Sequence, residues 1–153
     1  MKENSRLRLR NTHLITITIT NRQKKLRIDR KRMHQAVQAI LQDAAITDAR
    51  IGVAIVGDPA IAKLHSEFLN DPTPTDVLSF VLEQAPGMLE GEVVVSADTA
   101  ASSAPQFGCT AEEELLLYVI HGTLHLVGYD DAGPRARAVM RKREKKYLSL
   151  PQT

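Results

Sequence analysis

Alternation of apolar and polar residues predicts the first strand of the fold. Over residues 14–20, Ile15, Ile17 and Ile19 fall on one side of an extended chain and threonines fall on the other. A period of two is typical of a strand with one buried face. Three further apolar runs predict strands at residues 50–56, 77–82 and 92–96.

Apolar residues spaced by three and four predict helices between these strands. Asp29 is suited to cap the first helix, whose apolar stripe begins at Met33 and continues to residue 44. The next helix is expected to follow Gly57, with Asp58 as its cap and Pro59 in its first turn. Its inward side chains are predicted to be Ile61, Leu64 and Phe68.

The second half of the chain contains further helix signals. Thr110 and Glu113 have the spacing of a capping box, which opens a helix expected to run to about residue 127. Gly128 suits the left-handed end of that helix. Loops are predicted at residues 70–75 and 83–89, a short helix at 97–106, and a last helix at 134–148. That last helix is predicted to face the core with Val139, Met140, Tyr147 and Leu148.

This order of elements predicts an α/β domain with one small mixed four-stranded sheet covered by helices. We expect a basic, disordered leader at residues 1–11 and one domain over residues 12–153, a length that one hydrophobic core can support. No apolar run could span a bilayer, and the N-terminus lacks the features of a signal peptide. The single cysteine fits a reducing compartment, so a cytoplasmic protein is expected.

Charge is divided unevenly along the chain, although the net charge is only +2. Residues 1–32 carry 11 Lys or Arg against two acids, and residues 135–146 carry seven against one acid. Residues 33–134 carry two basic residues against 15 acids. Such blocks are often solvated faces. They also fit basic ends that hold a polyanion and an acidic middle that holds a cation.

The most informative stretch is the pair His121 and His125, followed by Gly128 and two aspartates. Histidines at i and i+4 lie on one helix face, within reach of one zinc ion. A turn at Gly128 would then bring Asp130 or Asp131 to the same ion as a third ligand. Two histidines and a carboxylate leave a position for water, which is the arrangement of a catalytic zinc.

Several alternatives remain open at this point. Two histidines at this spacing can be incidental, but the glycine at +7 and the acid at +10 match the geometry of metzincin-type metal sites. A zinc peptidase requires Glu as general base directly after the first histidine, where this chain has Gly122. Two histidines and a carboxylate also suit Fe(II) in an oxygenase.

The segment from His121 to Asp131 resembles the signature of the YbeY family, the rRNA maturation endoribonucleases. Residues 75–80 (TDVLSF) match a second block of that family and residues 89–96 a weaker third one. The resemblance implies a zincin-like fold and a zinc-dependent, single-strand-specific endoribonuclease. It also implies a role in trimming the 3′ end of 16S rRNA and in ribosome quality control. The register of the signature assigns His121, His125 and Asp131 as the ligands of one zinc ion.

Two positions depart from the family pattern. Asp131 stands where the third ligand is usually histidine, a change that zinc tolerates. Leu69 replaces an arginine that would suit a phosphate or a developing oxyanion. Because the residues offer no protein general base, metal-bound water is the expected nucleophile.

RNA and the ribosome are the partners that the resemblance implies. Arg135, Arg137, Arg141 and Lys142 follow the metal loop and are expected to hold the RNA backbone. Thr75 and Ser79 are candidates for the cleft, although turn capping and strand packing are the simpler explanation for both. The rival interpretations are a zinc metallopeptidase and a non-catalytic ribosome-assembly factor with a structural zinc.

Overall fold

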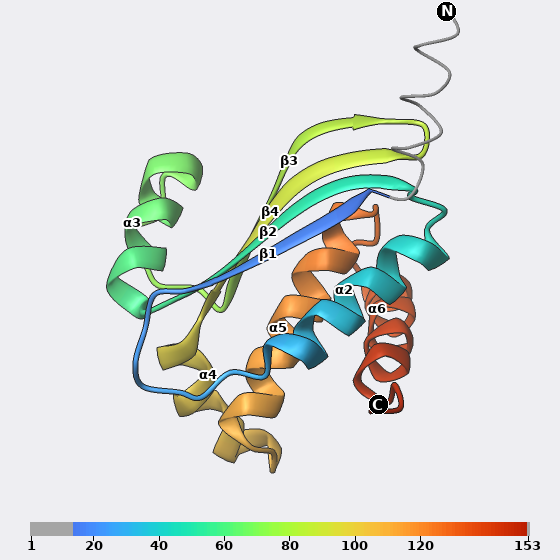
Figure 1. Ribbon diagram of the computed structural model, residues 1–153. Helices are drawn as coiled ribbons and strands as arrows, with labels where there is room; N and C mark the ends of the chain where they lie inside the picture. Colours follow the sequence, from blue (N-terminus) through green and yellow to red (C-terminus); the bar gives the residue numbers. More distant parts are fainter. Residues whose placement is uncertain (1–13, 153) are drawn as a thin grey trace, which may run out of the picture.

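The computed structural model describes residues 14–152, so the leader predicted at residues 1–11 lies outside the described residues. The strands and helices follow one another in the predicted order. They form an α/β fold in which one sheet is covered mainly on one face by helices (Figure 1). The predicted fold class is therefore confirmed.

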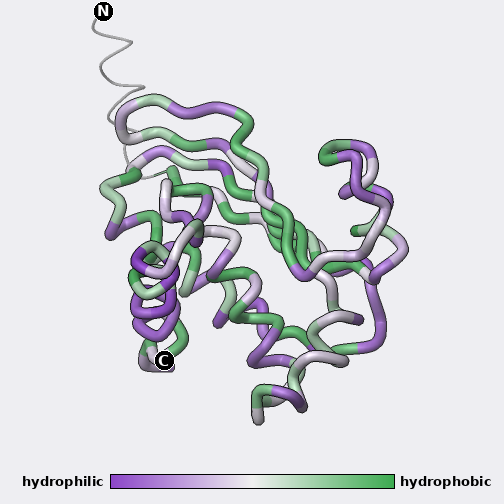
Figure 2. Tube along the Cα trace, turned by 180° about the vertical axis from the view of Figure 1, so that it is seen from behind, coloured by the Kyte–Doolittle hydropathy of each residue, from purple (hydrophilic) through white to green (hydrophobic). Residues whose placement is uncertain are grey.

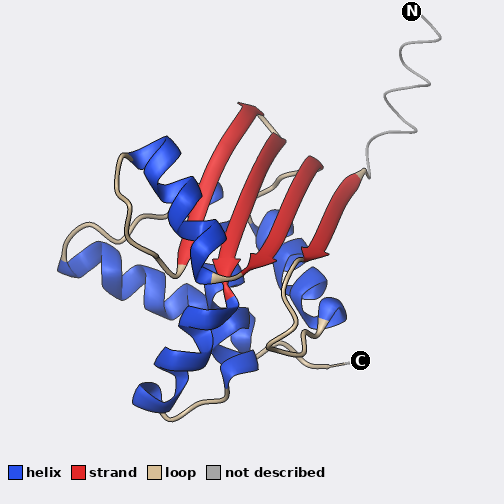
Figure 3. Ribbon diagram, turned by 90° about the vertical axis from the view of Figure 1, so that its left-hand side faces the viewer, coloured by secondary structure: helices blue, strands red, loops and turns tan. Residues whose placement is uncertain are grey.

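The sheet has four strands in the order β1-β2-β4-β3 (Figure 3). They are β1 (Ile15–Asn21), β2 (Asp48–Val56), β3 (Val77–Ala85) and β4 (Met88–Ser96). The first three in spatial order are parallel, and β3 pairs antiparallel with β4 at the edge. The sheet is mixed, as the sequence predicts.

The main core lies between one face of the sheet and a layer of helices. This layer contains α2 (Arg30–Asp43), α4 (Ala97–Ser103), α5 (Ala111–Leu126) and α6 (Pro134–Leu148), with a 3₁₀ turn, η1 (Ala104–Phe107), between α4 and α5. A smaller apolar cluster joins α3 (Asp58–Leu69) to the other side of the sheet.

Two predicted helix caps are present in the structure. The Asp29 side chain accepts a hydrogen bond from the Arg32 amide at the start of α2. Thr110 and Glu113 form the reciprocal capping box that opens α5. The capping residue of α3 is different from the prediction, because Gly57 occupies that position and Asp58 lies in the first turn. The Asp58 carboxylate instead accepts hydrogen bonds from the Ser96 and Thr99 hydroxyls.

Three details of the predicted pattern are wrong. Residues 83–89 are not a loop, because β3 and β4 continue to a two-residue turn at Pro86 and Gly87. Phe68 is 63% exposed and contacts the Phe80 ring at the margin of the smaller cluster. Val139 is also exposed, because it lies about 100° around α6 from the buried Met140.

The helix α5 is buried on most of its surface because it contacts the sheet and three other helices. Its half-exposed stripe includes Leu117, His121 and His125. In contrast, α6 is strongly hydrophilic along its trace (Figure 2) and buries only Met140 and Tyr147. Within residues 14–152, no helix combines the length and the apolar character needed to cross a membrane.

Candidate metal centre

The two histidines of α5 point their ring nitrogens at one place. Their Nε2 atoms are 3.0 Å apart, and the rings meet edge to face. The spacing of four residues puts them on successive turns, at the end of α5 where the surrounding elements leave the helix partly exposed. The two side chains are 22% and 29% exposed, so a ligand can approach from solvent.

Asp131 adds a carboxylate to this pair. The helix ends near Val127, and Gly128, with φ of 105°, turns the chain back toward the histidines. The Oδ2 atom of Asp131 lies 3.4 Å from Nε2 of His121 and 3.8 Å from Nε2 of His125. Within residues 14–152, these three residues form the only group of at least three His, Cys, Asp or Glu side chains close enough to share an ion.

The triangle of donor atoms has the dimensions of a small tetrahedral metal site. Ligands at 2.0–2.1 Å from zinc in tetrahedral directions are about 3.3 Å from one another. The three measured separations, 3.0, 3.4 and 3.8 Å, bracket that value. These residues therefore fit a divalent metal ion with two nitrogen ligands, one oxygen ligand and at least one open position.

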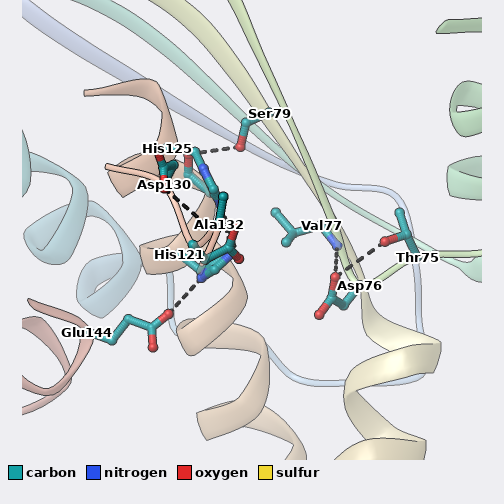
Figure 4. Close-up of polar contacts among 11 residues, drawn as sticks. Thr75, Asp76, Val77, Ser79, His121, His125, Asp130, Ala132 and Glu144 are labelled. Atoms are coloured by element: carbon teal, nitrogen blue, oxygen red, sulfur yellow. Dashed lines mark hydrogen bonds and ion pairs between the residues drawn. The ribbon is translucent and has the colours of Figure 1, made fainter. Parts of the chain in front are cut away.

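Glu144 of α6 holds His121 in place, a role that the local sequence pattern does not indicate (Figure 4). Its Oε2 atom accepts a hydrogen bond from Nδ1 of His121 at 2.7 Å. This bond directs the Nε2 lone pair toward the donor triangle. The carboxylate of Glu144 raises the pKa of His121, while partial burial opposes the shift. The only available signal was that Glu144 is the single acid among the basic residues of 135–146.

Asp130 is directed to the loop backbone. Its Oδ1 atom accepts a hydrogen bond from the Ala132 amide at 3.1 Å, which closes a local turn (Figure 4). Asp130 is outside the donor triangle. The two neighbouring aspartates therefore have different surroundings, with one beside the histidines and one bracing the loop.

Gly122 allows α5 to lie very close to the sheet. A Cβ atom at this position would come within 2.5 Å of Val93 Cγ1 and 2.9 Å of Val77 Cγ2. The backbone oxygen of Gly122 also accepts a hydrogen bond from the Ser79 hydroxyl at 2.8 Å. Position 122 thus faces the sheet and has no room for the glutamate of a zinc peptidase.

A cleft of about 470 Å³ leads away from His121. Its walls come from the loop before β3, from α4 and η1, and from α5, with Glu144 at the end nearest the histidine. Thr75 lines this cleft, as expected of a cleft candidate. Ser79 does not line it and lies instead in the contact between β3 and α5. Leu69, at the exposed end of α3, is also absent from its lining residues.

The four cations predicted to hold RNA are all exposed on α6. Helical periodicity separates them into two pairs. Arg137 and Arg141 precede Glu144 by seven and three residues, so they lie on the face that meets His121. Arg135 and Lys142 lie on roughly the opposite face.

Comparisons with known proteins agree with this fold. A family model described as "Endoribonuclease YbeY" matches residues 18–151. An "Endoribonuclease YbeY" of Rhodopirellula baltica is 45% identical over 115 residues, which are 72% of this chain and 59% of the relative. One of Geobacter sulfurreducens is 33% identical over 142 residues, covering 88% and 94% of the two chains.

A solved structure also resembles this one. The solution structure of a protein from Thermotoga maritima is 31% identical and superimposes with a TM-score of 0.61. The match covers 87% of each chain. The similarity in sequence and in fold therefore extends over most of the described residues.

Proposed function

This chain belongs to the endoribonuclease YbeY family, and we propose that it is a zinc-dependent endoribonuclease that cleaves single-stranded RNA. Its proposed role is maturation of the 3′ end of 16S rRNA and ribosome quality control, with rRNA and the ribosome as partners in the cytoplasm. The observation that carries the proposal is the triangle of His121, His125 and Asp131, of which His121 lines an open cleft.

The proposed reaction is hydrolysis of a phosphodiester bond. Zinc in this site would lower the pKa of a water molecule and polarise the scissile phosphate. His121, His125 and Asp131 would hold the ion, and Glu144 keeps His121 in the tautomer whose Nε2 faces it. Arg137 and Arg141 are suited to hold the phosphates on either side of the scissile bond. No protein group is assigned as a general base.

The surroundings of the site argue against both rivals. A zinc peptidase would need a glutamate at position 122. In this chain that position is Gly122, which packs against Val93 and Val77. A structural zinc has four protein ligands, whereas within residues 14–152 three donors are grouped, and one of them, His121, lines a cleft. Zinc is preferred to Fe(II) because hydrolysis uses its Lewis acidity and needs no redox change.

The third ligand can be identified by comparing Asp131→Ala with Asp130→Ala. Loss of a residue that only hydrogen-bonds to a metal ligand weakens metal binding by roughly 10- to 100-fold. Because Asp131 would bind the ion directly, we expect Asp131→Ala to weaken zinc binding by more than that. Asp130→Ala should leave the affinity nearly unchanged, because its carboxylate braces the loop. Competition titrations with a zinc-sensitive dye measure both variants. A larger loss in Asp130→Ala would reverse the assignment.

Asp131→His provides the complementary test. This variant should retain zinc, because histidine is an equally suitable ligand. Replacing a carboxylate with a neutral ring leaves more uncompensated positive charge on the ion. The pH profile of RNA cleavage should therefore move to lower pH. A profile that stays in place would show that residue 131 does not act on the ion.

Arg137 and Arg141, which share the Glu144 face of α6, should contribute most to RNA binding. Each contact with single-stranded RNA adds about 0.7 to the slope of log affinity against log salt. Arg137→Gln with Arg141→Gln should therefore flatten the slope by about 1.4. Arg135→Gln with Lys142→Gln removes the same charge from the opposite face and is the matched control. If the control pair flattens the slope more, the phosphate path lies elsewhere.

The proposed activity is tested by offering RNA and protein substrates to the same preparation. The purified protein should cleave labelled single-stranded RNA and leave casein intact. A chelator should abolish RNA cleavage, and added zinc should restore it. Chelator-sensitive casein hydrolysis without RNA cleavage would favour the peptidase and overturn the proposal.

A further inference from the structure

The cleft beside the metal centre is longer than the reacting phosphate requires. Besides His121 and Glu144, its walls include Ser103 at the end of α4, and Gln106 and Phe107 from η1. Glu114 and His121 line the same wall seven residues apart, about 10 Å along the helix. The volume of about 470 Å³ lies within the usual range for sites that enclose one small organic group.

Phe107 is the most exposed large apolar residue in the described part of the chain. Its side chain is 70% exposed, and it lies in η1, shortly before the start of α5. A single exposed apolar residue is common on protein surfaces. This one, however, borders the cleft that also reaches the metal ligand His121. An aromatic ring in that position offers a flat surface to whatever enters the cleft.

The residues that line the cleft offer no positive charge that would hold a phosphate. Among the described residues that line it there is no lysine or arginine, while Asp76, Glu114 and Glu144 are all acids. Glu114 is 5% exposed and interacts with the Tyr118 hydroxyl, which also contacts Ser103. A polyanionic backbone would be repelled here. A neutral group with a flat apolar face and a polar edge fits both the ring and the acceptors.

We infer that this cleft binds an unstacked nucleobase of the RNA substrate, stacked on Phe107, with polar groups such as Gln106 and Thr75 beside its edge. The inference rests on the proposed function and would explain why the protein prefers single-stranded RNA. A base can enter the cleft only after leaving its helical stack and its pairing partner. The backbone remains outside, between the metal centre and the arginines of α6.

The contribution of the stacking contact is measurable because Phe107 is exposed and its removal should not disturb the fold. Stacking on one aromatic ring commonly changes affinity by about tenfold. For the zinc-loaded protein, Phe107→Ala should lower kcat/KM for a short single-stranded RNA by about that factor. Phe107→Tyr should restore it. Exposed Phe68→Ala, on the other side of the sheet, is the matched control and should have no effect.

A series of RNA substrates tests whether the ring contacts a base. A single abasic site is moved along the oligonucleotide, and one position should reproduce the tenfold loss in the wild-type protein. In Phe107→Ala the same abasic site should cause little further loss, because the contact is already gone. If the losses from the abasic site and from Phe107→Ala multiply, the ring and that base act independently. That result, or an RNA with no position sensitive to an abasic site, would overturn the inference even if RNA is cleaved.

Photocrosslinking separates this inference from the proposed function. A 5-bromouridine at the sensitive position, or at each position in turn if the RNA is not cleaved, should crosslink to the peptide that contains Phe107. Crosslinking without any cleavage would retain the base site and reject the ribonuclease. Cleavage without crosslinking, and with Phe107→Ala unaffected, would reject the base site.

Discussion

Replacing His121 and His125 together with alanine should remove the metal from the protein and abolish RNA cleavage. Their Nε2 atoms are 3.0 Å apart, and Asp131 alone would remain as a partly exposed carboxylate. Each histidine is a direct ligand in our account. Its loss should therefore weaken zinc binding by more than the roughly 10- to 100-fold that results from losing a residue that hydrogen-bonds to a ligand. Metal analysis should find well under one equivalent of zinc in the double variant.

The control for this experiment is His34→Ala, which removes an exposed histidine from α2. It should retain the zinc content and activity of the wild-type protein. Thermal unfolding of all variants shows whether the fold persists. A folded double variant that still binds one equivalent of zinc with wild-type affinity would disprove this metal centre.

Gly122→Ala should destabilise the protein, although alanine is normally the better helix residue. The helix propensity gained is about 1 kcal/mol. This gain is opposed by steric clashes, because the new Cβ atom would lie 2.5 Å from Val93 and 2.9 Å from Val77. Overpacking of a core costs about 1–3 kcal/mol and occasionally more, and valine side chains cannot rotate freely to make room. The 2.5 Å contact places the cost in the upper half of that range, so we expect a net loss of about 1–2 kcal/mol and a Tm lower by several degrees.

A compensating variant gives this prediction a control. Val93→Ala alone creates a cavity, because Val93 is completely buried. Combined with Gly122→Ala, it also provides space for the new methyl group. The double variant should be more stable than the sum of the two losses predicts. If Gly122→Ala raises the Tm, α5 does not approach the sheet as closely as described.

The same contact explains why this site differs from a zinc peptidase. Gly122→Glu should disrupt the packing of α5 on β3 and β4 and should not create peptidase activity, because the side chain would point at the sheet. The sequence shows only that the glutamate is missing. The reason for its absence requires the position of the valines, which are far from Gly122 in the sequence.

Features that depend on neighbouring residues could be predicted from the sequence. The alternation of isoleucine and threonine identified β1, and the spacing of Thr110 and Glu113 identified the start of α5. The spacing of His121 and His125 was sufficient to place their rings together, because an α-helix fixes that geometry.

Features that depend on distant contacts could not be predicted in this way. Near their connecting turn, β3 and β4 have their apolar runs interrupted by Glu83, Gln84 and Glu90, and their backbone pairing decides that they are strands. Phe68 has helical spacing but faces the margin of a small cluster, and a periodic pattern does not show how far a core extends. Glu144 contacts His121 across 23 positions, which no local pattern indicates.

The measurement that tests the central claim most directly is RNA cleavage as a function of zinc occupancy. Metal-stripped protein is titrated with zinc, and the initial rate of single-stranded RNA cleavage is recorded at each ratio. Our account predicts negligible activity without metal, a linear rise with bound zinc, and a plateau at one equivalent per chain. Full cleavage by protein shown to be free of metal would contradict it.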